Sequence, residues 1–217
     1  MSARIVPDDV DGRAIAVATL RSGGVVALPT DTVYGIAVAL DAAGGVERLF
    51  EVKRRPPDKG IVLLLDDAAQ ADSIGLMGPA ATALADAFWP GGLTIVVPQR
   101  PDAVIPDVLT GGARTIGLRV PDHATPRTLA QGVGPLPTTS ANVSGFPEAR
   151  DAAEILEQLG EGIDLILDGG PAHGGPASTV VDCTWERPVI LREGAIPATQ
   201  IASILDGAGI DHDLAGG

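Results

Sequence analysis

The sequence predicts an α/β fold, in which a single domain is built on a twisted mixed β-sheet flanked by helices. The chain has 217 residues and a hydrophobic content of 45%, which is enough for a full core. Apolar runs of strand length alternate with longer segments of helical period, as is typical of this class. No internal repeat or shift of composition marks a second domain. We therefore expect one domain over residues 1–207 and a flexible tail over 208–217.

The elements follow from the apolar pattern and from the turn residues that interrupt it. A helix is expected over residues 11–22, because Gly23 and Gly24 follow it and glycine commonly ends helices. Short apolar runs predict strands at 25–28, 61–65, 93–97, 115–120, 136–139, 165–167, 178–182 and 189–192. Segments of helical period predict further helices at 44–53, 79–88, 126–131, 152–159 and 196–205.

The charge balance argues against general nucleic-acid binding. The net charge is -13, from 28 acidic and 15 basic residues, so the surface as a whole should repel nucleic acid. Any RNA contact is expected to be weak and local.

The cysteine content and the apolar runs indicate a cytoplasmic protein without membrane contact. Cys183 is the one cysteine, so no intrachain disulfide is possible. Its apolar neighbours favour a buried structural role over a nucleophilic one. The first residues lack the apolar core of a signal peptide, and no apolar run reaches the roughly 20 residues that span a bilayer.

A basic run stands out in this acidic chain. Residues 53–60 hold both lysines of the protein, Lys53 and Lys59, together with two arginines. Such a run is suited to gripping a phosphate group, and we interpret it as a phosphate clamp. A solvated basic end of the helix over 44–53 is the structural alternative, because cations are favourable at helix C-termini.

Three connections between predicted elements are rich in glycine and in hydroxyl groups. The segment 29–35 follows a strand and offers ligand groups at its carboxyl end, where α/β folds often bind ligands. Residues 137–145 offer hydroxyl and amide groups that can bond phosphate or sugar oxygens, and 168–179 form a long glycine-rich loop that could close over a ligand. Ordinary turns and helix caps are the alternatives. No Walker A or dinucleotide-binding pattern is present.

Five ordered motifs resemble the YrdC/TsaC family. They are PTDTVYG at 29–35, KRRP at 53–56, FWPGGLT at 88–94, SANVSG at 140–145 and STV at 178–180. The resemblance runs from about residue 25 to 194, and the agreement of five motifs in order is far more specific than any one short match. It implies a YrdC-like domain with a concave basic ligand site, in the short single-domain form of the family.

The resemblance further implies a threonylcarbamoyl-AMP synthase. Such an enzyme joins L-threonine, bicarbonate or CO₂, and ATP into threonylcarbamoyl-AMP and pyrophosphate. The product is used by t6A-transfer proteins that modify adenosine 37 of tRNA. Mg²⁺ is expected to arrive with ATP and to be held mainly by phosphates and waters, because the acidic and histidine residues show no ligand spacing. Asp31 is a possible helper, and a turn-capping role is its alternative.

The motifs carry the family's functional positions onto this sequence. Lys53 and Arg55 are implied as catalytic residues. Nucleotide contacts are implied for Arg55, Lys59, Thr115, Ser140, Asn142 and Arg192, and threonine contacts for Thr32, Arg119, Thr138 and Ser178. One departure is Leu64, which stands where many longer relatives have a histidine, so threonine binding must be built differently there.

Two other classes of function remain open from the sequence. One is an RNA-binding or ribosome-assembly factor, which the net charge disfavours. The other is a YrdC-like paralogue with carbamoyl-adenylate chemistry, because a shared fold does not fix the reaction.

Overall fold

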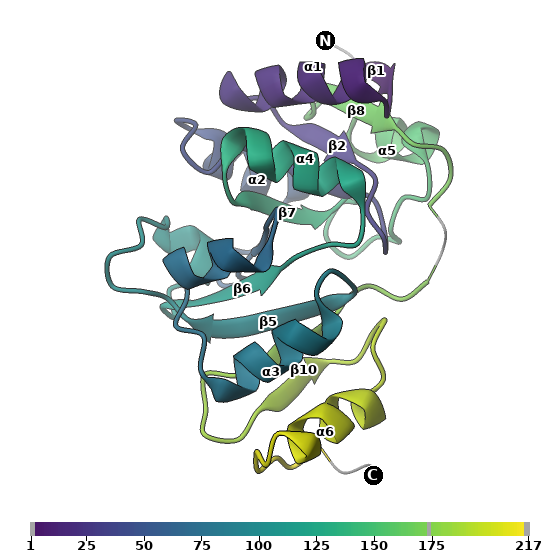
Figure 1. Cartoon of the computed structure of the whole chain (residues 1–217). Helices are drawn as coiled ribbons and strands as arrows, with labels where there is room; N and C mark the ends of the chain where they lie inside the picture. The colour runs from purple at the N-terminus through teal and green to yellow at the C-terminus, as the bar shows by residue number, and fades with distance from the viewer. Residues whose placement is uncertain (1–2, 173–174, 215–217) are drawn as a thin grey trace.

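The computed structural model describes residues 3–172 and 175–214. In these ranges ten strands form one mixed sheet in the order β1-β8-β2-β3-β7-β4-β6-β5-β9-β10 (Figure 1). The predicted α/β class with a mixed sheet is confirmed. The strands are β1 (Arg4–Pro7), β2 (Val26–Leu28), β3 (Gly35–Ala37), β4 (Val62–Leu64), β5 (Leu93–Pro98), β6 (Thr115–Arg119), β7 (Leu136–Ser140), β8 (Leu165–Asp168), β9 (Thr179–Asp182) and β10 (Val189–Arg192). The helices are α1 (Val10–Arg21), α2 (Gly45–Lys53), α3 (Pro79–Phe88), α4 (Ala124–Val133), α5 (Ala152–Leu159) and α6 (Ala198–Gly207), with short 3-10 helices η1 (Ala68–Ser73) and η2 (Asp107–Thr110).

The sequence pattern missed two strands, β1 and β3. In β1 only Val6 is buried, so no apolar run marks the strand. β3 has three residues and begins at Gly35, directly after the hydroxyl-rich connection, so it has the appearance of a continuing loop. Each is held by its neighbours instead: β1 pairs with β8, and β3 lies between β2 and β7.

Helices cover both faces of the sheet. On one face α1 and α4 lie side by side (Figure 1). Their Leu20 and Leu129 share a buried cluster with Leu28 of β2 and Leu167 of β8. On the other face α2, α3, α5 and α6 pack over a larger cluster, to which they contribute Leu49, Leu84, Ile155 and Ile201. Each helix therefore presents one apolar stripe to the sheet, as amphipathic helices do.

The layer of α1 and α4 ends near the middle of the sheet. α1 packs against β2 and β8, and α4 packs against β7 and β4. The same face continues over β6, β5 and β9. This continuation carries the polar residues of the site described next, and we call it the open face.

Candidate functional site

A cavity of about 400 Å³ lies over the open face. Most of its floor is made by alternate residues of five strands, because side chains at i and i+2 share one face of a sheet, and Thr139 of β7 lines the cavity as well. These residues are Val62 and Leu64 of β4, Thr94 and Val96 of β5, Thr115, Gly117 and Arg119 of β6, Thr138 and Ser140 of β7, and Val180 of β9. The residues between them, such as Ile95 and Ile116, are buried in the core on the other face. The cavity thus lies on the face of the sheet, not at the ends of its strands as the sequence pattern had suggested.

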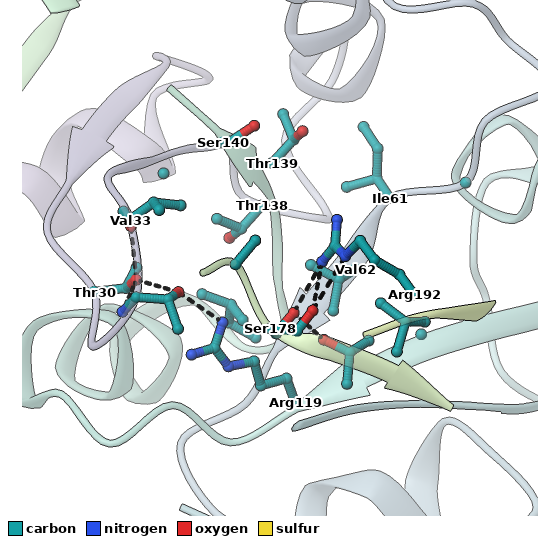
Figure 2. A pocket seen from close by; sticks show the side chains of 18 of the residues that line it. Thr30, Val33, Ile61, Val62, Arg119, Thr138, Thr139, Ser140, Ser178 and Arg192 are labelled. Carbon is teal, nitrogen blue, oxygen red and sulfur yellow. Dashed lines mark hydrogen bonds between the residues drawn. The ribbon is translucent and has the colours of Figure 1, made fainter. Parts of the chain in front are cut away.

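Arg119 is fixed on three sides at one end of the cavity, where Figure 2 shows its side chain. Its Nε donates to the carbonyl oxygen of Gly91 at 2.9 Å, and its Nη1 donates to Thr32 Oγ1 at 3.1 Å. Its Nη2 donates to Asp31 Oδ1 at 2.7 Å, and the two side chains are 6% and 14% exposed. Burial lowers the pKa of Arg119, while the Asp31 carboxylate opposes that shift. Thr32 and Arg119, both predicted to bind threonine, are therefore in direct contact.

Ser178 and Arg192 form a second polar group above the floor (Figure 2). Arg192 donates through Nε and Nη2 to the carbonyl oxygen of Ser178, at 3.1 and 2.8 Å, and through Nη2 to its hydroxyl at 3.2 Å. The Ser178 hydroxyl lies 2.9 Å from that of Thr94. Thr138, another predicted site residue, lines the cavity and donates its hydroxyl to the carbonyl oxygen of Leu136.

The basic run places one of its side chains in the cavity. Arg55 lines the cavity and is held by backbone carbonyls, because its Nε donates to Lys59 O at 2.9 Å and its Nη2 donates to Gly60 O. Burial lowers the pKa of Arg55, and the nearby charge of Arg192 lowers it further. Lys59 is exposed, and its side chain is not part of the lining.

Lys53 differs from the expectation of a side chain that faces the ligand. It is 3% exposed and does not line the cavity. Its Nζ donates to Ser140 O and Asn142 Oδ1, both at 2.5 Å, and to Ser140 Oγ at 3.0 Å. Lys53 and Asn142 therefore reach the cavity only through Ser140, which does line it.

The helical period of α2 predicts that Lys53 is buried. Val46, Leu49, Phe50 and Lys53 recur at i, i+3, i+4 and i+7, and all four are buried. This spacing defines the face that a helix turns toward the core. Reading Lys53 as part of a surface charge run overlooked its place on that face.

The unassigned side chains that the structure brings to the cavity wall include Thr30, Thr94 and Glu148. Thr30 donates its hydroxyl to the carbonyl oxygen of Val33, and this hydroxyl lies 3.2 Å from that of Thr32. Because Thr30 belongs to the PTDTVYG motif, the motif could have identified it as a site residue. Thr94 ends the FWPGGLT motif. Glu148 comes from an exposed loop before α5, and no sequence pattern marks it.

Tyr34 joins two of the glycine- and hydroxyl-rich connections. Its phenol is 1% exposed, donates to Gly170 O at 2.6 Å and accepts from Gly169 N at 3.1 Å. Burial raises the pKa of this phenol. The segment 29–35 is thereby tied to the start of the loop 168–179, of which residues 173–174 lie outside the described residues.

The described part of the chain gives little support for a metal site, a reactive cysteine or a membrane-spanning helix. Among residues 3–172 and 175–214, no group of three or more His, Cys, Asp or Glu side chains is arranged to hold a metal ion. Burial raises the pKa of the Cys183 thiol to about 12, so it stays protonated and unreactive at neutral pH. No helix in these ranges has the length and apolar character that crossing a bilayer requires.

Comparison with known proteins adds to this geometry. The family model Sua5/YciO/YrdC, described as "Telomere recombination", matches residues 18–194. A threonylcarbamoyl-AMP synthase of Bacillus subtilis is 38% identical over 205 residues, which cover 93% of this chain and 58% of that protein. A threonylcarbamoyl-AMP synthase of Vibrio vulnificus is 36% identical over 82% of this chain and 96% of its own length.

Among solved structures, Pyrococcus abyssi Sua5 complexed with L-threonine is similar, with a TM-score of 0.88 and 33% identity. The match covers 99% of this chain and 63% of that one. The chain thus spans about 58% of the length of the Bacillus relative and 63% of the Pyrococcus structure. The matched range and these identities show that the chain belongs to the Sua5/YciO/YrdC family.

Proposed function

We propose that the chain is a threonylcarbamoyl-AMP synthase, which makes threonylcarbamoyl-AMP and pyrophosphate from L-threonine, bicarbonate or CO₂, and ATP. The observation that carries the proposal is the convergence of two kinds of group in one cavity. Arg119 and Thr32 suit an amino-acid carboxylate, and Arg55, Ser140 and Arg192 suit phosphate oxygens. Relatives named for this activity and a threonine-bound Sua5 support the same reading.

The amino acid is assigned to the Arg119 end. Three of the five N–H groups of Arg119 are engaged by Gly91, Thr32 and Asp31. One N–H on each terminal nitrogen has no partner among the described residues, so a carboxylate can accept from the guanidinium there. We assign the threonine hydroxyl and amine to the surrounding hydroxyl groups of Thr32, Thr138 and Ser178.

The nucleotide is assigned to Arg55, Ser140 and Arg192, with Thr115 lining the same end of the floor. The threonine amine first captures the CO₂ unit as a carbamate. A carbamate oxygen then attacks the α-phosphorus of ATP and forms a P–O bond, while the bond to pyrophosphate breaks. The arginines neutralise charge on the transferring phosphate, and the cavity orients both reactants. Lys53 and Asn142 hold Ser140 in place for this step, and Lys59, exposed beside the lining residue Gly60, offers a further positive charge.

Mg²⁺ fits this site as an ion that ATP brings with it. Glu148 is the one carboxylate that lines the described cavity, so phosphates and waters must supply most of its ligands. When bound, the ion neutralises phosphate charge. The labile product then passes to proteins that transfer the threonylcarbamoyl group to adenosine 37 of tRNA.

The test is pyrophosphate release from ATP and bicarbonate, with mass detection of the adenylate. L-threonine, no amino acid, and carbamoyl phosphate in place of threonine are compared. Threonine-dependent pyrophosphate with a threonylcarbamoyl-AMP mass is expected. Turnover with carbamoyl phosphate alone would instead assign the chain to carbamoyl-adenylate chemistry, and silence in all three reactions would refute adenylate formation.

Arg55 and its neighbour provide a matched pair of variants for this assay. Arg55→Ala should lower turnover by roughly 10²–10³-fold, because it removes a charge that faces the transferring phosphate. Arg54→Ala makes the same change of net charge one residue away, at an exposed position outside the cavity lining, and should keep wild-type turnover. Equal losses in both variants would remove Arg55 from the site.

A further inference from the structure

The three arginines that line the described cavity differ in one respect. Arg119 has a carboxylate partner, Asp31, at 2.7 Å. Arg55 donates only to the carbonyl oxygens of Lys59 and Gly60, and Arg192 only to Ser178. Glu148 also lines the cavity, but within the described residues no ion pair joins any carboxylate to Arg55 or Arg192. The charge of Arg119 is therefore compensated by a carboxylate, whereas the charges of Arg55 and Arg192 are not.

The compensated cation stands apart from Arg55 along the floor. β4 and β6 are parallel, and Leu64 is paired with Arg119 at their carboxyl ends. Arg55 is bonded to Lys59 and Gly60, just before β4 begins. Leu64 follows Gly60 by four residues, which corresponds to roughly 13 Å of extended chain. Arg192 belongs to neither end alone, because it donates to Ser178 and its charge acts on both Arg55 and Arg119 (Figure 2).

Asp31 acts on the cavity through Arg119. It is not part of the lining, and its carboxylate accepts a hydrogen bond from Arg119 Nη2. Burial disfavours the charged form of Arg119, and Asp31 offsets that cost while fixing the plane of the group. The same negative charge repels a polyanion that approaches this end, whereas a zwitterionic amino acid has no net charge and loses little.

We propose that Asp31 is a specificity-determining and positioning residue that divides the cavity electrically. It reserves the Arg119 end for a zwitterionic amino acid and leaves the polyphosphate to the uncompensated Arg55, with Arg192 in reach of both ligands. This inference rests on the proposed function for the identity of the two ligands. It predicts that removal of the Asp31 charge admits polyphosphate to the amino-acid end.

The test is calorimetric binding of inorganic pyrophosphate and of L-threonine to the intact chain. Wild type is compared with Asp31→Asn, which keeps the size of the side chain and an oxygen acceptor but removes the charge. Asp8→Asn is the matched control, because Asp8 forms a similarly buried ion pair with Arg13 at 2.8 Å, and neither of these residues lines the cavity. Asp31→Glu keeps the charge and should behave as wild type.

The expected result has two parts. Saturating pyrophosphate should leave threonine affinity unchanged in wild type and in Asp8→Asn, but weaken it at least about tenfold in Asp31→Asn. Pyrophosphate affinity should rise at least about fivefold in Asp31→Asn and stay near wild type in Asp8→Asn. Threonine binding that is insensitive to pyrophosphate in Asp31→Asn would overturn the proposal.

Two further outcomes keep the inference separate from the proposed function. If threonine binds to none of the proteins, the proposed function fails. In that case, equal pyrophosphate affinities in Asp31→Asn and Asp8→Asn would on their own refute the proposed role of Asp31. If Asp31→Asn does not fold by circular dichroism, wild type still decides, because displacement of threonine by pyrophosphate in wild type contradicts the proposal.

Discussion

The ammonium group of Lys53 is a buried charge that holds a cavity residue from behind. It donates to two oxygens of Ser140 and one of Asn142. Burial, and after it the charge of Arg55, lower its pKa to about 8, while Glu148 opposes the shift. A neutral amine has only two N–H groups, so it cannot donate to all three oxygens. Deprotonation therefore loosens the support of Ser140.

This predicts a loss of turnover as the pH rises through about 8. Pyrophosphate formation at low ATP should fall by about tenfold one pH unit above that pKa. Lys53→Met should have low turnover without this titration. A wild-type profile that is flat through pH 8, or an unchanged profile in Lys53→Met, would contradict the role.

The same pKa has the opposite effect on stability. The ordinary value for lysine is 10.5 and the folded value about 8, so between them the unfolded chain binds more protons than the folded one. The contribution of Lys53 to the free energy of unfolding therefore increases as the pH rises through this window. Wild type compared with Lys53→Met in urea unfolding at pH 7.5 and 9.5 measures the difference, which should have the opposite sign to the change in turnover.

The Arg119–Asp31 pair predicts a separation of stability from binding. Arg119→Ala leaves the Asp31 carboxylate buried without its partner and should cost about 3–5 kcal/mol of unfolding free energy. It should also weaken threonine binding by about 2–5 kcal/mol. The double variant Arg119→Met, Asp31→Asn removes both charges, so it should recover most of the stability in thermal unfolding but none of the threonine affinity. Threonine binding by the double variant would exclude Arg119 as the carboxylate partner.

At the scale of one strand, β6 leaves room above the cavity floor because Gly117 has no side chain. A Cβ on Gly117 would lie 3.3 Å from Thr94 Cγ2 and 3.8 Å from Val62 Cγ2. Alanine therefore needs a shift of a few tenths of an ångström, and a larger side chain must project into the cavity.

Gly117→Ala should stay within about 1 kcal/mol of wild-type stability, and Gly117→Val should lose ligand binding while it keeps the fold. Circular dichroism and calorimetry check the two effects. Wild-type affinity for ATP and threonine in Gly117→Val would mean that the ligands do not lie on this part of the floor.

Some elements could be predicted from the sequence and others could not, and the reasons are physical. β5 was predictable because an apolar run follows the FWPGGLT motif, and β6 because the apolar Ile116 and Leu118 alternate along a short segment. β1 and β3 are held mainly by pairing with distant strands, which local patterns do not encode. Thr32 and Arg119 lie 87 residues apart, yet motif resemblance grouped them. The pairing of Asp31 with Arg119 and the burial of Lys53 depend on tertiary packing. From the sequence alone, the role of Asp31 therefore stayed undecided, and Lys53 was expected to face the ligand.

At the scale of the molecule, the net charge of -13 predicts that the chain does not coat RNA. Binding of tRNA at physiological salt should be weaker than the roughly 10⁻⁴–10⁻⁶ M that is typical of non-specific binders. Filter binding over a salt series checks this. Tight binding that declines steeply with salt would favour an RNA-binding role instead.

The alternation of floor and core along the same strands links activity to correct strand pairing. If β6 slipped by one residue, Ile116 and Leu118 would point into the cavity, while Thr115 and Arg119 would be driven into the apolar layer. A misregistered sheet would then lose its core and its ligand groups in a single event. Turnover is therefore a reporter of register for this protein: chains that regain activity after refolding must have recovered the native pairing of β4, β5 and β6.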